Sequence, residues 1–154
     1  SVMSQSVSSP SVDRGLLIIR LALGLVFVMH GWQKLAVFGV AGTAGFMASL
    51  GLPFPTVNAV AITAVELVGG LMLVAGAGTR IAGALLSFSM LVAVVTAHLA
   101  SGFFLPNGYE FALTMSLVSL AVVLTGAGRY SVDARVFGRA PVLATTAPVY
   151  RKAA

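Results

Sequence analysis

The strongest constraint in this sequence is a set of four long apolar segments, at residues 15–35, 56–77, 80–102 and 109–128. About 20 residues at ~1.5 Å per residue carry an α-helix across the hydrocarbon core of a bilayer, so each segment is long enough to span one. The segments are continuously apolar and do not alternate, which argues against a transmembrane β-barrel. We therefore predict an all-α membrane protein built as a bundle of four transmembrane helices.

Composition supports a membrane protein and excludes several kinds of site. The chain is 58% hydrophobic and 8% charged, whereas a soluble domain carries about 25% charged residues. The absence of cysteine excludes dithiol chemistry, thiolate metal sites and Fe–S clusters. The net charge of +5 resides at the ends of apolar segments and forms no single patch, so we expect no nucleic-acid partner.

The polar flanks predict the domain limits and the orientation. Residues 1–14 are Ser-rich and predicted to be disordered, with residues 1–2 read as a cloning scar, and residues 129–154 form a basic tail after the helical domain 15–128. By the positive-inside rule, both termini should be cytoplasmic, because one face would hold seven Lys and Arg residues and the other would hold Lys34 alone. The seven are Arg14, Arg80, Arg129, Arg135, Arg139, Arg151 and Lys152.

A glycine-rich stretch lies between the first two long segments. Its glycines make a spanning helix unfavourable, yet Phe46, Met47 and Leu50 would share one face of a helix. We predict a short interfacial or re-entrant helix there.

The charged and imidazole side chains within the long segments are the candidate functional residues. A charge at mid-bilayer costs roughly 2.5–3.5 kcal/mol on insertion scales, so each one retained requires an explanation. The candidates are Arg20, His30, Lys34, Glu66, His98 and Glu110.

Glu66 could be neutral and bonded to a hydroxyl or a backbone carbonyl group, because burial disfavours the charged form of a carboxyl group. Two further roles are open to it. One is a structural ion pair with Arg20, whose long side chain would reach toward the level of Glu66 and fix helix–helix register. The other is proton handling beside a ligand pocket, for which Glu110 is the second candidate.

The two histidines also have two readings. Each could bind a neighbouring carbonyl group at the outer interface, or both could converge with Lys34 and Glu110 on one outer pocket that binds a ligand. Two histidines and one carboxylate are a known metal-ligand set, but no i, i+4 spacing supports one, so we predict no metal site. Gly69 and Gly70, one turn beyond Glu66, would allow close helix packing or let a flat ligand ring lie beside the backbone.

The sequence resembles the DoxX family of small four-helix membrane proteins. The resemblance rests on ordered stretches that cover about three quarters of the chain, of which no single one is decisive. They are "RLALGLVFVMHGWQKL" (20–35), "GTAGFMASLGLP" (42–53), "VELVGGLMLVAGAGTR" (65–80), "AHLASGFF" (97–104) and "NGYEFALTMSLVSLAVVLTGAGRYSVD" (107–133). It implies a bacterial-type cytoplasmic membrane, quinone-linked electron transfer, and partnership with soluble oxidoreductases or detoxification enzymes. It assigns no catalytic residue.

Three functions follow as hypotheses. The first is a quinone- or lipid-interacting subunit, in which Arg20, His30, Lys34, His98, Gly69 and Gly70 bind the ligand and Glu66 and Glu110 handle protons. The second is a non-catalytic anchor or assembly partner with a structural Arg20–Glu66 pair, whose basic tail meets lipid, a soluble oxidoreductase at the cytoplasmic face or a second copy of the chain. The third is a small proton-coupled transporter.

Overall fold

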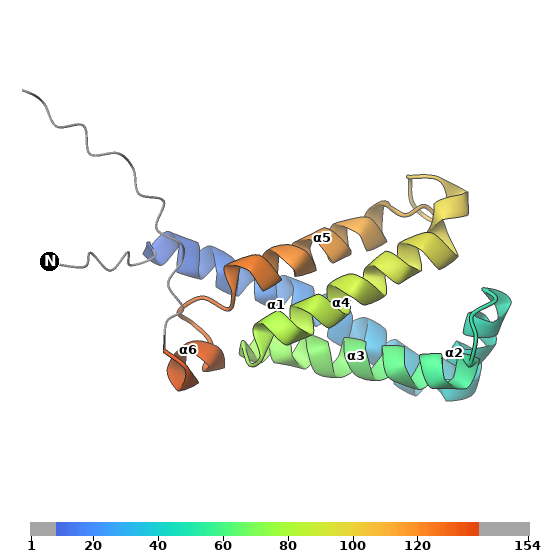
Figure 1. Ribbon diagram of the computed structural model, residues 1–154, viewed down its shortest axis with the longest axis horizontal. Helices are drawn as coiled ribbons and strands as arrows, with labels where there is room; N and C mark the ends of the chain where they lie inside the picture. The colour runs from blue at the N-terminus through green and yellow to red at the C-terminus, as the bar shows by residue number, and fades with distance from the viewer. Residues whose placement is uncertain (1–8, 139–154) are drawn as a thin grey trace, which may run out of the picture.

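The computed structural model describes residues 9–138, and within this range the chain is helical and has no strand. Residues 1–8 of the predicted disordered segment 1–14, and residues 139–154 of the predicted basic tail 129–154, lie outside it. The α-helices are α1 (Pro10–Trp32), α2 (Gly39–Ser49), α3 (Pro55–Ala75), α4 (Thr79–Ala93), α5 (Glu110–Thr125) and α6 (Val132–Val136) (Figure 1).

Two of these helices continue into π-helix. The segment η1 (Gln33–Phe38) extends α1, and η2 (Val94–His98) extends α4 and passes into the 3₁₀ turn η3 (Leu99–Ser101). A π-helical turn widens the helix locally and is found frequently at functional sites. The sequence pattern did not predict either segment.

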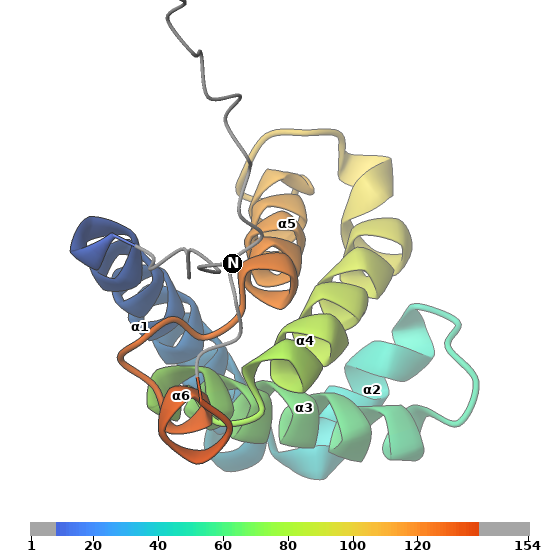
Figure 2. The ribbon, with the colours of Figure 1, turned by 60° about the vertical axis from the view of Figure 1, so that its left-hand side comes forward.

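The long helices form two closely packed pairs. The helix α1 packs against α3, and α4 packs against α5, while α3 also contacts α2 and α4. The molecule is elongated, with α2 at one end and α6 at the other, and we call these the α2 end and the α6 end (Figures 1 and 2). The predicted short helix between the first two apolar segments forms as α2.

The helix α1 begins at Pro10, so residues 10–14 are helical and not disordered as predicted. The Ser9 side chain accepts a hydrogen bond from the Val12 N–H, and Pro10 occupies the first helical position. Asp13 lies in the first turn, where a carboxylate favours the positive end of the helix dipole. These capping signals precede the apolar segment, which is why hydropathy alone placed the start too late.

Glycines bring α1 and α3 into close contact. A Cβ atom added at Gly70 would lie 2.9 Å from the Gly24 carbonyl oxygen, and one added at Gly31 would lie 2.6 Å from the Leu67 backbone nitrogen. Only the absence of a side chain permits this approach, as in other helix pairs packed through small residues. These contacts fix the antiparallel register of α1 against α3.

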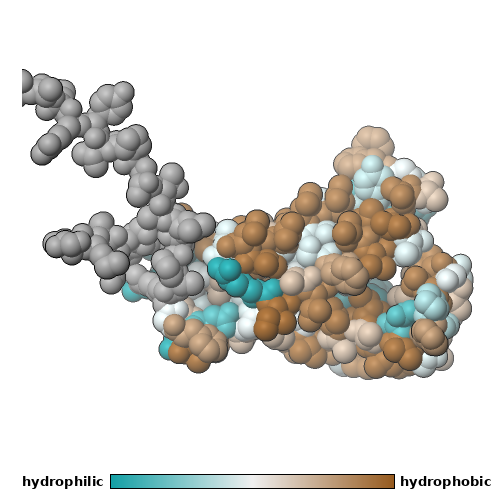
Figure 3. Space-filling view, viewed as in Figure 1, coloured by the Kyte–Doolittle hydropathy of each residue, from teal (hydrophilic) through white to brown (hydrophobic). Residues whose placement is uncertain are grey.

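The surface is largely apolar, as Figure 3 shows for one face. Large side chains such as Ile18, Phe88 and Leu124 are exposed. Two helical stretches, Pro55–Ala75 and Thr79–Ser101, are long and apolar enough to cross a membrane. Only 33% and 22% of their most apolar windows are buried, so neither resembles the buried core helix of a soluble protein. The helix α5, with 16 residues, is shorter.

Candidate functional site

A cavity of about 500 Å³ lies toward the α2 end, and α1, α2, α3, α4 and α5 all contribute to its wall. Most of its lining is aliphatic or aromatic, as in Phe27, Phe88 and Met115. The polar side chains that reach it are His30, Lys34, Asn58, Glu66, Ser89, Thr96 and His98. An apolar chamber of this size with a few polar groups has the general form of a small-molecule site.

The central polar feature of the cavity is an ion pair between Lys34 and Glu66. The Lys34 Nζ atom lies 2.7 Å from Glu66 Oε2, and the two side chains are 19% and 3% exposed. Glu66 projects from the middle of α3, whereas Lys34 projects from the π-helical segment η1. In this low-dielectric setting neither charge is tolerable without the other, so the pair must be retained together.

The predicted Arg20–Glu66 pair is wrong. The register fixed by the glycine contacts places Arg20 beside Gly76, ten residues of α3 away from Glu66. At ~1.5 Å per residue these residues span about 15 Å along the helix, beyond the reach of one side chain. Arg20 is fully buried, and its Nη2 atom donates to the Tyr130 carbonyl oxygen at 2.6 Å.

The two histidines line the cavity from different helices. His98 ends the π-helical segment η2, and its Nδ1 atom lies 3.0 Å from the Asn107 carbonyl oxygen. A carbonyl oxygen can only accept, so this contact requires the proton on Nδ1, which leaves Nε2 able to accept from a ligand. His30 is exposed and packs against Phe111, with ring centroids 6.1 Å apart.

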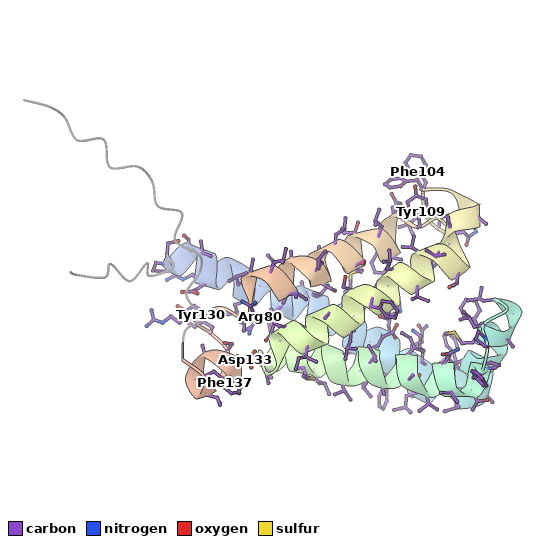
Figure 4. All side chains as sticks on the ribbon, viewed as in Figure 1. Arg80, Phe104, Tyr109, Tyr130, Asp133 and Phe137 are labelled. Carbon is purple, nitrogen blue, oxygen red and sulfur yellow. The ribbon has the colours of Figure 1, made fainter. Side chains whose placement is uncertain are left out.

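Glu110 lies outside the lining of the cavity, although the sequence reading grouped it with the histidines and Lys34. Its Oε1 atom accepts a hydrogen bond of 2.8 Å from the Leu105 N–H, and its own N–H donates to the Phe103 carbonyl oxygen. Glu110 therefore closes the loop between η3 and α5. Figure 4 shows this loop, with Phe104 and Tyr109, at the α2 end of the molecule.

Gly69, Gly70 and Arg20 also lie outside the cavity lining. Gly70 faces α1, and a Cβ atom at Gly69 would lie 3.2 Å from Leu86 of α4. The two glycines thus serve the contacts of α3 with its neighbours on two sides. Of the eight residues singled out from the sequence, the cavity brings together His30, Lys34, Glu66 and His98.

A second polar cluster, at the α6 end, was not foreseen from the sequence. We call it the clamp: Arg20, Gly76, Tyr130, Ser131 and Asp133, from segments far apart in the chain. The Asp133 carboxylate accepts from the N–H groups of Gly78 and Thr79 at 2.7 and 2.9 Å, at the start of α4. Figure 4 shows Asp133 and Tyr130 near this end of the helices.

The electrostatics of the clamp favour an ionised Asp133. Partial burial acts to raise the pKa of Asp133. This effect is outweighed by the hydrogen bonds from the backbone N–H groups of Thr79 and Gly78, by the Thr79 hydroxyl and by the positive charge of Arg20. The pKa of Asp133 therefore lies below its ordinary value of 3.8. The carboxylate caps α4 from outside that helix, where the helix dipole favours a negative charge.

Metal ligation finds no support within residues 9–138, where no three His, Asp or Glu side chains gather in a way that could hold an ion. The polar groups of the cavity are one ammonium, one carboxylate, two imidazoles, two hydroxyls and one amide. This set can donate and accept hydrogen bonds and exchange protons.

Comparison with known proteins identifies the family. The DoxX family model matches residues 15–99. The chain is 35% identical to CatD of Bacillus subtilis, which carries the provisional name of an oxidoreductase, over 82% of this chain and 90% of that protein. It is 32% identical to the inner membrane protein YphA of Escherichia coli, over 78% of this chain and 89% of that protein.

A further relative is an uncharacterized membrane protein of Mycobacterium tuberculosis, 32% identical over 79% of this chain and 81% of that protein. No solved structure matches the chain at a significant level. The family match, the named relatives and the two long apolar helices all indicate a helical membrane protein. The chain belongs to the DoxX family of helical membrane proteins.

Proposed function

We propose that the chain crosses the membrane four times, through α1, α3, the continuous stretch Thr79–Ser101 and α5, with both termini in the cytoplasm. The support for this topology is the alternating direction of these helices and the concentration of arginine on one side of the sequence-predicted bundle. The α6 end is then cytoplasmic, and the cavity lies toward the outer side.

We infer further that the cavity binds a flat, neutral ring with carbonyl oxygens, of which a membrane quinone is the natural example. The observation that carries this inference is the Lys34–Glu66 pair inside an apolar cavity of about 500 Å³, with two imidazoles also in its lining. The apolar lining suits the ring and its hydrocarbon tail, and the few polar groups suit the carbonyl oxygens. The relative named as an oxidoreductase is consistent with it.

The residues present fit the chemistry of such a ring. The Lys34 ammonium can donate a hydrogen bond to one carbonyl oxygen, and an N–H of the His30 imidazole can donate to another. The Glu66 carboxylate lies 2.7 Å from the Lys34 ammonium and can accept a proton. The pair can therefore pass a proton to a ligand oxygen and afterwards take up another proton in its place. A bound quinone supplies two-electron redox chemistry that consumes two protons. We assign the supply of electrons to a soluble oxidoreductase at the cytoplasmic face.

The test is retention of quinone by the purified protein. The chain is extracted from membranes in a mild detergent, and bound quinone is recovered in organic solvent and quantified per mole of protein. We expect near-stoichiometric quinone in the unmodified chain and a loss of at least fivefold in Glu66→Gln. Glu110→Gln makes the same chemical change outside the cavity and should retain quinone. Absence of bound or titratable quinone in the unmodified chain would exclude the proposal.

The alternative is a membrane anchor for a soluble enzyme, and one observation favours it. The clamp holds α6 against the turn between α3 and α4 while Val136 and Phe137 stay exposed, at 64% and 82%. Such an apolar and basic surface suits a protein partner at the cytoplasmic face. If Val136→Ser combined with Phe137→Ser abolishes recovery of an oxidoreductase after mild extraction, and quinone is absent, the anchor is the better description.

A further inference from the structure

A second concave site lies between α1 and α5, separate from the cavity. It is a groove of about 290 Å³. Leu16 and Ile19 of α1 form one wall, and Leu117, Ala121 and Thr125 of α5 contribute to the other. Leu16 and Ile19 lie in the N-terminal half of α1, and the α5 residues run from the middle of that helix to its C-terminal end, so the groove extends toward the α6 end.

Arginines stand at the end of this groove. The Arg129 N–H donates to Asp13 Oδ1 at 2.9 Å, which holds the chain after α5 against the first turn of α1. A Cβ atom at Gly128 would lie 3.2 Å from Leu16, a groove residue. Arg129 is exposed and directly follows Gly128, whereas Arg14 is on the side of α1 that faces away from Leu16 and Ile19.

A second arginine lies close by on α4. The guanidinium of Arg80 is beside Gly126, 3.4 Å from the position of a Cβ atom there, and Gly126 follows the groove residue Thr125. The acidic groups at this end are Asp13 and Asp133. Both are turned inward to backbone N–H groups, so the accessible charge is positive.

We propose that this groove binds an anionic phospholipid, with one acyl chain along the apolar walls and the headgroup phosphate on Arg80 and Arg129. A hydrocarbon groove with cations at the membrane surface matches a molecule that is apolar along its length and negative at one end. Each arginine near the surface favours an anionic headgroup by a factor of roughly five. A lipid without net charge gains much less from the same residues.

A second copy of the chain is a poorer occupant of the groove. Two copies related by a twofold axis along the membrane normal would place the same residues at the same depth. The arginines at the end of the groove would then face their own counterparts and repel one another. An anionic lipid has the opposite charge at that position.

Native mass spectrometry of the delipidated protein in mild detergent tests the proposal. The probes are phosphatidylglycerol, phosphatidylcholine with the same acyl chains, and inorganic phosphate. We expect phosphatidylglycerol adducts at least fivefold more abundant than phosphatidylcholine adducts. In Arg80→Gln combined with Arg129→Gln, phosphatidylglycerol binding should fall more than tenfold, whereas Arg135→Gln, which removes one charge on α6, should change it less than twofold.

A change in the groove that leaves the charges intact completes the test. Ala121→Phe fills part of the apolar wall and should reduce phosphatidylglycerol binding while thermal unfolding shows that the protein is folded. Equal binding of both lipids would overturn the proposal, as would equal effects of the groove arginines and Arg135. Binding of inorganic phosphate alone would identify an ion site in its place. A dimer that Ala121→Phe dissociates, and that no lipid displaces, would identify a protein interface.

Discussion

The cavity and the clamp are both polar clusters within an apolar protein, yet their hydrogen bonding is opposite. In the clamp, the Asp133 carboxylate caps α4 through two backbone N–H groups, and Arg20 binds a backbone carbonyl group. In the cavity, the hydrogen-bond partner that the structure gives the Glu66 carboxylate is one side chain, Lys34, in a space large enough for a ligand. Polar groups fixed by the backbone hold a fold together, whereas polar groups that face a cavity keep their capacity for other partners.

The largest expected effect is on the clamp, at Gly76. Its φ of +69° is unfavourable for other residues, and a Cβ atom there would collide with the Arg20 guanidinium and Ser131. Gly76→Ala combines backbone strain with overpacking and should lower the free energy of unfolding by about 3–4 kcal/mol. The measurement is unfolding in mild detergent titrated with sodium dodecyl sulfate.

Gly51→Ala is the matched control for Gly76→Ala. Gly51 has a φ of +72°, but no atom outside its local backbone lies within 4 Å of a Cβ atom added there. This variant should lose only the strain, about 1 kcal/mol. Equal losses in the two variants would show that Gly76 is required for its backbone conformation alone and that the packing of Arg20 contributes nothing.

The next effect concerns the Lys34–Glu66 pair. Glu66→Gln leaves the Lys34 ammonium in the cavity without its counter-charge and should cost roughly 2–3 kcal/mol, less than a fully buried pair because Lys34 is 19% exposed. Combining Glu66→Gln with Lys34→Gln removes both charges and should restore most of that loss. If the double variant is as unstable as the single one, the pair contributes through its shape and its hydrogen bond, and not through charge.

A smaller effect is expected at Asp133 and depends on pH. The folded-state pKa of Asp133 is lowered, so its contribution is fully present above the ordinary value of 3.8 and is lost as pH falls through the lower folded-state pKa. Asp133→Asn should cost about 1–2 kcal/mol at pH 7, and the difference from the unmodified chain should shrink below pH 3.8 and vanish below the folded-state pKa. Thermal unfolding between acid and neutral pH measures it. A difference that grows toward acid pH would contradict the clamp.

The comparison also explains what the sequence could and could not predict. Continuous apolar segments and Gly-rich interruptions predicted the helices and the short α2, because both depend on local pattern. The partner of Glu66 depends on helix register, which the Gly24 and Gly70 contact sets and which hydropathy does not encode. Asp133 lies more than fifty residues from the N–H groups that it caps, so its role emerges only when the chain folds back.

The smallest effect on stability, and the sharpest on ligand binding, is expected at His98. Its Nδ1–H is bound to the Asn107 carbonyl group, so Nε2 is the atom left for the cavity. His98→Phe keeps a flat ring and should lower the free energy of unfolding by no more than about 1 kcal/mol, the value of one neutral hydrogen bond.

Retention of the reduced ring, a quinol, should nevertheless fall about fivefold in His98→Phe, because a hydrogen bond of that strength from a quinol hydroxyl to Nε2 is lost. The oxidised quinone offers only acceptor atoms to Nε2, so its retention should not change. His98→Gln keeps a side-chain oxygen that can accept, so it should retain more quinol than His98→Phe at similar stability. The measurement is quinone and quinol per mole of purified protein, under oxidising and reducing conditions, beside thermal unfolding of the same samples. Unchanged quinol retention in both variants would mean that the ligand contacts Lys34 and Glu66 without His98, and the polar part of the site would then be confined to the side of the cavity formed by α1 and α3.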